Sequence, residues 1–361
     1  MFSPRRSRHI PEELSENFRK MLKRHVLHYK GHFEFESGGS LESLDLVYHT
    51  SDREYRKGEK VVWVCHALTG NSNPEDWWPT MVGKGLLFDP EKVYVVCSAM
   101  LCSPYGECGP ATVNPATGKP YFLDFPRTTV RDIVSANILV RKHLGIEKID
   151  LMLGPSIGGF QTLEWVIMEP DVVEKAVFLA TAMRGTPYMT AFNESQRMAL
   201  LADPSFLAAE SLKGGEAGLK CARSIALISY RTFMGYNLSQ AECEDDTVFA
   251  DRAASYQRYQ GQKLVNRGFD AYSYWYLTYS LDSMNVGRGR GGVKKALEQI
   301  KSSCTVISIT SDQLFPPGQL RETAEILSNA AYYEINSIYG HDGFLLENDQ
   351  LAAILKPLLD S

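Results

Sequence analysis

Several features that would assign a chain to a class at once are missing from these 361 residues. No apolar run approaches the roughly 20 residues that a membrane-spanning helix needs. No basic and then apolar segment of the secretory type opens the chain. We therefore expect a cytoplasmic protein without a membrane partner. The net charge is only −5, which argues against nucleic acid or an acidic lipid surface as the main partner.

Metal, disulfide and nucleotide signatures are also lacking. None of the seven cysteines belongs to a Cys-x-x-Cys pair or has a histidine at metal-ligand spacing. An odd, scattered set in a long chain is typical of reduced thiols. The segment 116–119 (ATGK) has part of a phosphate-binding loop, but Val113 replaces its first glycine and Pro120 its final Ser or Thr. We predict no metal and no permanently bound cofactor.

What the sequence does contain is a strand, a sharp turn and a helix in direct succession, at residues 149–168. The apolar run 149–153 breaks into Gly154-Pro155-Ser156-Ile157-Gly158, and helical spacing follows. In that context Gly-x-Ser-x-Gly is the nucleophile elbow of α/β-hydrolase folds, although the pattern alone also occurs in ordinary glycine turns. Small residues let the turn tighten, and the helix N-terminus offers donors to a developing oxyanion. Ser156 is therefore the candidate nucleophile.

Other apolar runs and helical patterns alternate along the chain. Strands are predicted at 61–65, 93–97, 176–180, 305–310 and 330–338, and helices at 129–144, 320–327 and 351–358. Alternating residues over 33–48, with a turn at Gly38-Gly39, predict two more strands. Strands and helices in this order form a mostly parallel sheet with helices on both faces. We predict the α/β class and an α/β-hydrolase fold.

Three parts of the chain differ in composition. Residues 1–31 are rich in Lys and Arg and predict a solvated N-terminal extension with an amphipathic helix from residue 11; its glutamates count against a transit peptide. Residues 32–183 and 300–361 form the predicted core domain. Residues 184–299 show helical patterning and predict an inserted lid over the carboxyl edge of the sheet, where such folds bind ligands. Its aromatic-rich second half suggests core or a subunit interface, and the run 287–292 (GRGRGG) a flexible surface loop.

Serine is a poor nucleophile at neutral pH and needs a base that a carboxylate orients. In α/β hydrolases the order is serine, acid, histidine, with the last two on turns after late strands. Ser156, Asp312 and His341 fit that order. The turn after strand 61–65 suggests the Leu68 N–H as a second oxyanion donor beside the Ile157 N–H, but spacing alone favours an ordinary turn equally.

Several longer stretches together resemble the homoserine O-acetyltransferase family. They are 66–71 (HALTGN), 114–121 (NPATGKPY), 123–126 (LDFP) with 129–132 (TVRD), 191–194 (AFNE), 259–261 (YQG) and 340–342 (GHD). The resemblance covers about residues 33–358. It implies that acetyl-CoA, as co-substrate, acylates the elbow serine, and that the side-chain hydroxyl of L-homoserine takes the acetyl group in methionine biosynthesis. It also implies that Arg231 binds the homoserine carboxylate and Asp342 its ammonium, and, with the aromatic-rich lid, suggests a homodimer through the lid.

The sequence departs from the family pattern in places. Pro155 and Ile157 stand where the family usually has Gly and Met, residues 266–270 carry an extra glycine, and 287–292 is an added loop. Three rival functions therefore stay open. They are the same chemistry with succinyl-CoA or L-serine, an esterase that uses the same triad, and a non-catalytic binding module, against which the triad counts.

Overall fold

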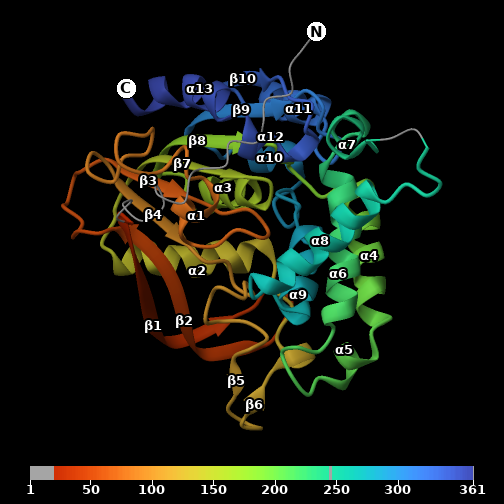
Figure 1. Ribbon diagram of the computed structural model, residues 1–361. Coiled ribbons are helices and arrows are strands. Elements are labelled where there is room, and N and C mark those ends of the chain that lie inside the picture. Colours follow the sequence, from red (N-terminus) through yellow and green to blue (C-terminus); the bar gives the residue numbers. More distant parts are fainter. Residues whose placement is uncertain (1–19, 244–245, 361) are drawn as a thin grey trace.

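An eight-stranded sheet runs through the computed structural model, which describes residues 20–243 and 246–360. The strand order is β1-β2-β4-β3-β7-β8-β9-β10. All pairs from β4 to β10 are parallel, and β2 pairs antiparallel with both β1 and β4 (Figure 1). The strands are β1 (Leu22–Glu34), β2 (Ser40–Ser51), β3 (Val61–Val64), β4 (Tyr94–Ser98), β7 (Ile149–Pro155), β8 (Val173–Leu179), β9 (Ser303–Ile309) and β10 (Ala330–Ile335). The predicted mostly parallel sheet is confirmed.

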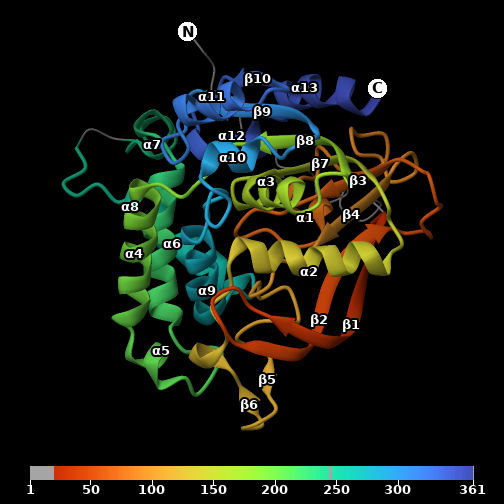
Figure 2. The same cartoon turned by 180° about the vertical axis from the view of Figure 1, so that it is seen from behind.

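Helices cover both faces of this sheet. One face packs against α2 (Val130–His143), α3 (Ile157–Met168) and α11 (Pro317–Ile326), and α2 and α3 lie in front of the strands in Figure 2. The other face packs against α1 (Pro74–Trp77), α12 (Gly343–Leu346) and α13 (Asn348–Asp360). In β3, Val61 and Trp63 belong to the first core, and Val62 and Val64 to the second. Burial on both faces explains why the central strands read as continuous apolar runs.

Between β8 and β9 the chain leaves the sheet for a group of helices. They are α4 (Pro187–Leu201), α5 (Pro204–Ala208), α6 (Glu216–Tyr230), α7 (Phe233–Gln240), α8 (Arg252–Asn266), α9 (Ala271–Asp282) and α10 (Val293–Leu297). Helices α4, α6, α8 and α9 stand together beside the sheet (Figure 1). At the neck of the insertion, the Gly185 N–H donates to Met284 O (2.8 Å) and the Val286 N–H to Met183 O (3.1 Å). The helical insertion therefore closes at about residue 285, and α10 follows the neck.

The loop between β4 and α2 contains the ATGK segment, which we did not interpret as a nucleotide site. It carries a small hairpin of β5 (Val113–Asn114) and β6 (Lys119–Pro120), and then the 3-10 turn η2 (Phe122–Asp124). The ATGK segment is thus a hairpin turn rather than the link between a strand and a helix that a phosphate-binding loop requires.

The predicted N-terminal extension is too long. Strand β1 begins at Leu22 and pairs with β2 from Leu22 opposite Ser51 to Glu34 opposite Ser40, with a shift in register between Lys30 and Phe33. Residues 22–31 therefore belong to the sheet, since their backbone groups satisfy those of β2 and the Leu22 side chain enters the core. The predicted helix from residue 11 falls mostly on residues outside the described range, but its last two apolar positions, Met21 and Leu22, are not helical.

The arginine-glycine run at 287–292 is anchored rather than free. Arg288 pairs with Glu36 (2.7 Å), and Arg290 pairs with Glu164 of α3 (2.7 Å). The Glu164 side chain is only 2% exposed and also binds Arg131 of α2 at 2.6 Å. A buried carboxylate with two guanidinium partners ties this loop to the helix that follows Ser156, which corrects the prediction of a flexible surface loop.

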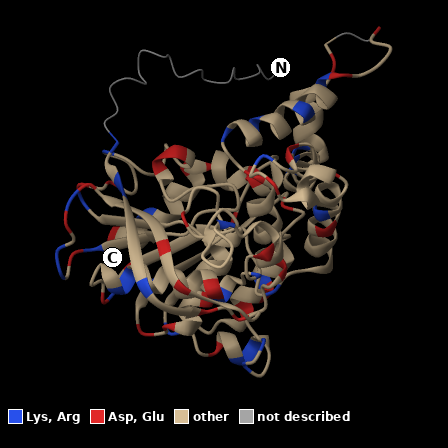
Figure 3. Ribbon diagram, turned by 90° about the horizontal axis from the view of Figure 1, so that it is seen from below, with Lys and Arg blue, Asp and Glu red and all other residues tan. Residues whose placement is uncertain are grey.

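Charges of both signs are interspersed over the elements drawn in Figure 3. Within residues 20–243 and 246–360, no helix is long and apolar enough to cross a membrane. In the same ranges, no group of three or more His, Cys, Asp or Glu side chains is arranged to hold a metal ion.

Candidate active site

The turn between β7 and α3 holds Ser156 in a strained conformation. Its φ of 59° and ψ of −123° are unusual for a residue with a side chain and cost of order 1–3 kcal/mol. A β-carbon at Gly154 would lie 2.5 Å from Cys65 O, and one at Gly158 would lie 2.2 Å from the same atom. Both glycines are therefore required by the close approach of β3, as the elbow pattern predicts.

Pro155, the unusual residue of the elbow, fits the end of β7. Strand β3 pairs with β7 only as far as Val64 opposite Leu153, and the Cys65 N–H donates to Leu153 O (2.8 Å). The missing N–H of Pro155 therefore lies beyond this ladder. On the other side, the Ser156 N–H still donates to Leu179 O of β8 (3.0 Å). Proline is tolerated at a strand end of this kind.

Asp312 and His341 meet, although 29 residues separate them. Asp312 follows β9, and His341 lies in the 3-10 turn η3 (Gly340–Asp342) after β10. The His341 Nδ1 lies 2.7 Å from Asp312 Oδ2, and both side chains are almost fully buried. Asp312 Oδ1 accepts the N–H groups of Leu314 (2.8 Å) and Phe315 (3.0 Å). These bonds fix the carboxylate and leave His341 Nε2 as the free nitrogen of the ring.

The two predicted oxyanion donors border the serine. Ile157 is the first residue of α3, and Leu68 lies in the loop after β3. Neither N–H has a hydrogen-bond acceptor in the part of the chain that the structure describes. Buried amide groups without a partner are rare. Two of them beside one strained serine form an arrangement that can accept an oxyanion.

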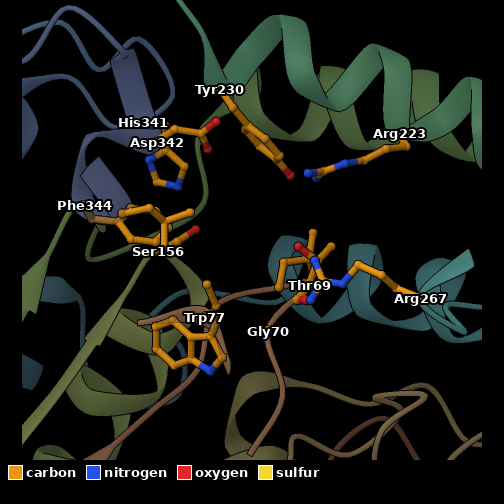
Figure 4. Close-up of a pocket in the computed structure, with 13 residues that line it drawn as sticks. Thr69, Gly70, Trp77, Ser156, Arg223, Tyr230, Arg267, His341, Asp342 and Phe344 are labelled. Atoms are coloured by element: carbon orange, nitrogen blue, oxygen red, sulfur yellow. The ribbon is translucent and has the colours of Figure 1, made fainter. Parts of the chain in front are cut away.

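A cavity of about 140 Å³ opens over Ser156. Figure 4 shows His341 and Asp342 beside Ser156, Tyr230 and Arg223 from α6 across the top, Trp77 below Ser156, and Arg267 on the opposite side from Trp77. The Arg223 guanidinium carbon is 5.7 Å from the centre of the Tyr230 ring. Burial raises the pKa of the Tyr230 hydroxyl; the positive charge of Arg223 opposes this shift and the negative charge of Asp342 adds to it. Opposite charges thus face one cavity beside the serine.

A second, much smaller cavity of about 20 Å³ also reaches Ser156 and Leu68. Its walls are mainly apolar or uncharged: Met189, Phe192, Asn193, Gln196, Ser229, Tyr230, Leu281 and Leu314. No charged residue is among them. Ser156 therefore lies between a charged cavity and a small neutral one.

Arg231, predicted to bind a carboxylate, is not on the wall of the larger cavity. It follows the last residue of α6, and its Nε lies 3.1 Å from Asp342 Oδ2. Its guanidinium carbon is 5.4 Å from the centre of the Tyr256 ring. Arg231 is thus paired with Asp342, the other residue predicted to bind the substrate, and its role as a carboxylate ligand stays a prediction. Asp342 lines the larger cavity, and its predicted role as the ammonium ligand likewise stays a prediction.

Known proteins are similar to this chain over most of its length. The family described as "alpha/beta hydrolase fold" matches residues 60–347. Homoserine O-acetyltransferase of Cyclobacterium marinum is 42% identical over 321 residues, which cover 89% of this chain and 91% of that protein. The chain belongs to the homoserine O-acetyltransferase family.

Solved structures extend the comparison. Homoserine O-acetyltransferase from Staphylococcus aureus has a TM-score of 0.76 at 30% identity, over 94% of this chain and 96% of that one. An acetylester hydrolase from Corynebacterium glutamicum has a TM-score of 0.81 at 22% identity, over 94% and 96% of the two chains. At that identity the second match shows the fold alone, and both agree with the predicted α/β-hydrolase architecture.

Sequence reasoning missed Trp77, Arg223, Tyr230 and Arg267 in the larger cavity, and also the apolar residues Phe344 and Leu345. One signal was available for two of them. Arg223 and Tyr230 are seven residues apart, and this spacing puts them on the same face of helix α6, two turns apart. Trp77 and Arg267 gave no such signal, because they lie at the ends of α1 and α8, which only the tertiary fold brings together.

Proposed function

We propose that the protein transfers an acetyl group from acetyl-CoA to the side-chain hydroxyl of L-homoserine through an acyl intermediate on Ser156. Family membership supports the reaction. The observation that carries the acceptor assignment is the cavity beside Ser156, whose walls present a guanidinium and a carboxylate. An amino acid needs both, because it carries a carboxylate and an ammonium group.

In the first half of the reaction His341 acts as the base. Its Nε2 takes the Ser156 hydroxyl proton while the Asp312 carboxylate stabilises the imidazolium. The serine oxygen attacks the thioester carbonyl, and the Leu68 and Ile157 N–H groups bind the resulting oxyanion. Collapse of this intermediate breaks the carbon–sulfur bond. The CoA thiolate takes the proton from His341, and the acetyl group stays on Ser156.

The second half repeats these steps with a new nucleophile. His341 removes the proton of the homoserine hydroxyl, whose oxygen attacks the acetyl-serine carbonyl. The ester forms on homoserine, and Ser156 recovers its proton from His341. In this proposal Arg223 binds the carboxylate, the role that the family resemblance implies for Arg231, since Arg223 faces the cavity and can hold a carboxylate bidentately. Asp342 binds the ammonium group.

The smaller cavity supports acetyl rather than succinyl as the acyl group. Its volume of about 20 Å³ has room for little more than one water-sized group. The four-carbon succinyl group ends in a carboxylate, for which the uncharged walls of this cavity offer no cation. We propose that the acetyl methyl occupies it.

The test is a matrix of donors and acceptors. Acetyl-CoA with L-homoserine is expected to release CoA and yield O-acetyl-L-homoserine faster than succinyl-CoA or L-serine in the same assay. The Ser156→Ala variant is the control. Equal rates for the variant and the natural protein would refute the proposal. CoA release with free acetate as the only other product would instead indicate a hydrolase.

We further propose that two copies associate through the lid. Large apolar side chains are exposed on α6, on α7 and in the segment after it: Ile228, Phe233, Met234, Leu238, Val248 and Phe249. Clustered exposed apolar residues are typical of interaction surfaces. Sedimentation equilibrium is expected to give a dimer, and a double variant Phe233→Asp with Leu238→Asp a monomer. A monomeric natural protein at micromolar concentration would contradict this.

We also propose a cytoplasmic location, which the free thiols of all seven cysteines support. Fractionation of cells that express the protein is the test, and recovery outside the cytoplasmic fraction would contradict it.

A further inference from the structure

One buried titratable residue beside the active site has no part in the reaction steps above. His66 follows β3 by two residues and is fully buried. Its Nε2 accepts the N–H of Met100 at 3.0 Å. A neutral imidazole carries one proton, so the other nitrogen must hold it. The Nδ1–H therefore donates to Ala67 O, 2.9 Å away.

The bond from His66 to Ala67 O affects the orientation of the next N–H group, that of Leu68. The carbonyl of Ala67 and the N–H of Leu68 belong to one peptide group. Peptide bonds are planar, and no cis bond occurs in the described chain. The two groups therefore point in opposite directions. A donor that holds Ala67 O on one side directs the Leu68 N–H to the other.

A second donor completes the clamp. The Gly70 N–H donates to the same Ala67 O at 2.9 Å. Two bonds to one carbonyl restrict rotation of the peptide and polarise it, so its N–H becomes a better donor. The Leu68 N–H has no acceptor among the described residues, and Leu68 borders both cavities that meet at Ser156.

The surroundings of the His66 ring keep the imidazole uncharged. Burial lowers the pKa of His66 to about 4, and the bond to the Ala67 carbonyl only partly opposes this. An imidazolium would carry a proton on both nitrogens, and its Nε2–H would then face the N–H of Met100. A neutral ring with its proton on Nδ1 is the one form that satisfies both neighbours.

We propose that His66 is a positioning residue for catalysis: its Nδ1–H holds the Ala67–Leu68 peptide so that the Leu68 N–H faces the oxyanion formed on Ser156. The inference rests on the proposed acyl transfer at Ser156. It differs from a purely structural role, in which His66 would only tie the loop after β3 to Met100 in the loop after β4.

Two substitutions separate these roles. In His66→Asn the side-chain amide occupies the region of Nδ1 and can donate to Ala67 O, but it does not reach Met100. In His66→Gln the side-chain oxygen occupies the region of Nε2 and accepts the Met100 N–H, and Ala67 O keeps only the Gly70 N–H as a donor. The loss of one oxyanion donor typically costs about 10²- to 10³-fold in kcat.

We expect kcat for acetyl transfer to fall about 10²-fold or more in His66→Gln and less than about 10-fold in His66→Asn. The KM for L-homoserine should change less than about 2-fold in both variants, because the ground state makes no use of the oxyanion site. Equal losses in the two variants, or a greater loss in His66→Asn, would overturn the proposal.

Phenylboronic acid gives a readout that does not depend on the identity of the substrates. It adds to a serine hydroxyl and places a tetrahedral oxygen at the oxyanion site. Its affinity should fall with kcat in His66→Gln and be largely kept in His66→Asn. A protein that binds the boronic acid in this pattern but does not acetylate L-homoserine would refute the proposed function and support the role of His66. Equal affinity in both variants would refute that role.

A measurement on the natural protein covers the case in which the variants do not fold. With ¹⁵N-labelled histidine, the NMR signal of His66 at neutral pH should be that of a neutral ring protonated on Nδ1. Protonation on Nε2 would overturn the proposal.

Discussion

The contact between the end of β3 and the start of α3 sets the distance between Ser156 and the loop after β3 that holds Leu68. The substitution Gly158→Ala tests the importance of this contact. An added β-carbon would lie 2.2 Å from Cys65 O, 3.0 Å from Cys65 C and 3.3 Å from His66 O. Ordinary contacts begin at 3.4 Å. The atoms within reach are backbone, so the two segments must separate by about 1 Å, because no side chain can move aside instead.

This separation acts on the reaction directly. Leu68 is three residues after Cys65, so its N–H moves with the displaced segment while Ser156 stays with α3. A misplacement of about 1 Å costs on the order of 10² in rate, and overpacking of a filled core costs about 1–3 kcal/mol in stability. We therefore expect kcat to fall about 100-fold and the free energy of unfolding to fall by about 2 kcal/mol.

The assay is steady-state acetyl transfer together with urea unfolding. Gly318→Ala is the matched control, since Gly318 lies in α11 and an added β-carbon there meets nothing within 4 Å. It should leave kcat unchanged and stabilise the protein by up to about 1 kcal/mol, because alanine loses less backbone entropy in a helix. A Gly158→Ala variant with the activity and stability of the natural protein would show that the close approach of β3 has no functional consequence.

Three further predictions follow from the site. Asp312→Asn should lower kcat about 10³- to 10⁴-fold, because an amide in place of the carboxylate favours the wrong tautomer of His341; a kcat equal to that of the natural protein would contradict this. Arg223→Met should raise the KM for L-homoserine at least about 10-fold, as expected for loss of a charge-assisted bond, and more than Arg231→Met does; the reverse order would restore Arg231 as the carboxylate ligand. The third concerns pH. The pKa of His66 is about 4 in the folded protein and about 6.5 for a histidine in an unfolded chain, so the unfolded chain binds a proton first as the pH falls. The natural protein should therefore lose about 3 kcal/mol of stability between pH 7 and pH 4 that His66→Gln does not lose; parallel urea-unfolding curves for the two would contradict it.

The central strands and the elbow could be predicted because their signals are local. Runs such as 149–153 are apolar on both faces, and the glycines at 154 and 158 are needed where β3 approaches the turn. The positions of Asp312 and His341 followed from chain order, since the ends of parallel strands meet at one edge of the sheet.

Features that depend on distant partners were not predictable. Residues 22–31 of β1 were taken for part of an extension, because most side chains of this strand are exposed or half-buried and its pairing with β2 shows that it is a strand. Arg290 was assigned to a free loop, but Glu164, which binds it, lies 126 residues earlier in the chain. Arg223 lines the larger cavity and Arg231 does not. This difference depends on where α6 ends and how it packs, and the local sequence shows neither.

Direct detection of the acyl intermediate tests the central claim most sharply. The protein would be mixed with acetyl-CoA alone, quenched within one turnover and digested for mass spectrometry, and the same sample would then be chased with L-homoserine. We predict one acetyl group on Ser156 before the chase, and its loss, at a rate no slower than kcat, into O-acetyl-L-homoserine. An unmodified Ser156 before the chase, or acetate as the only product after it, would contradict the account.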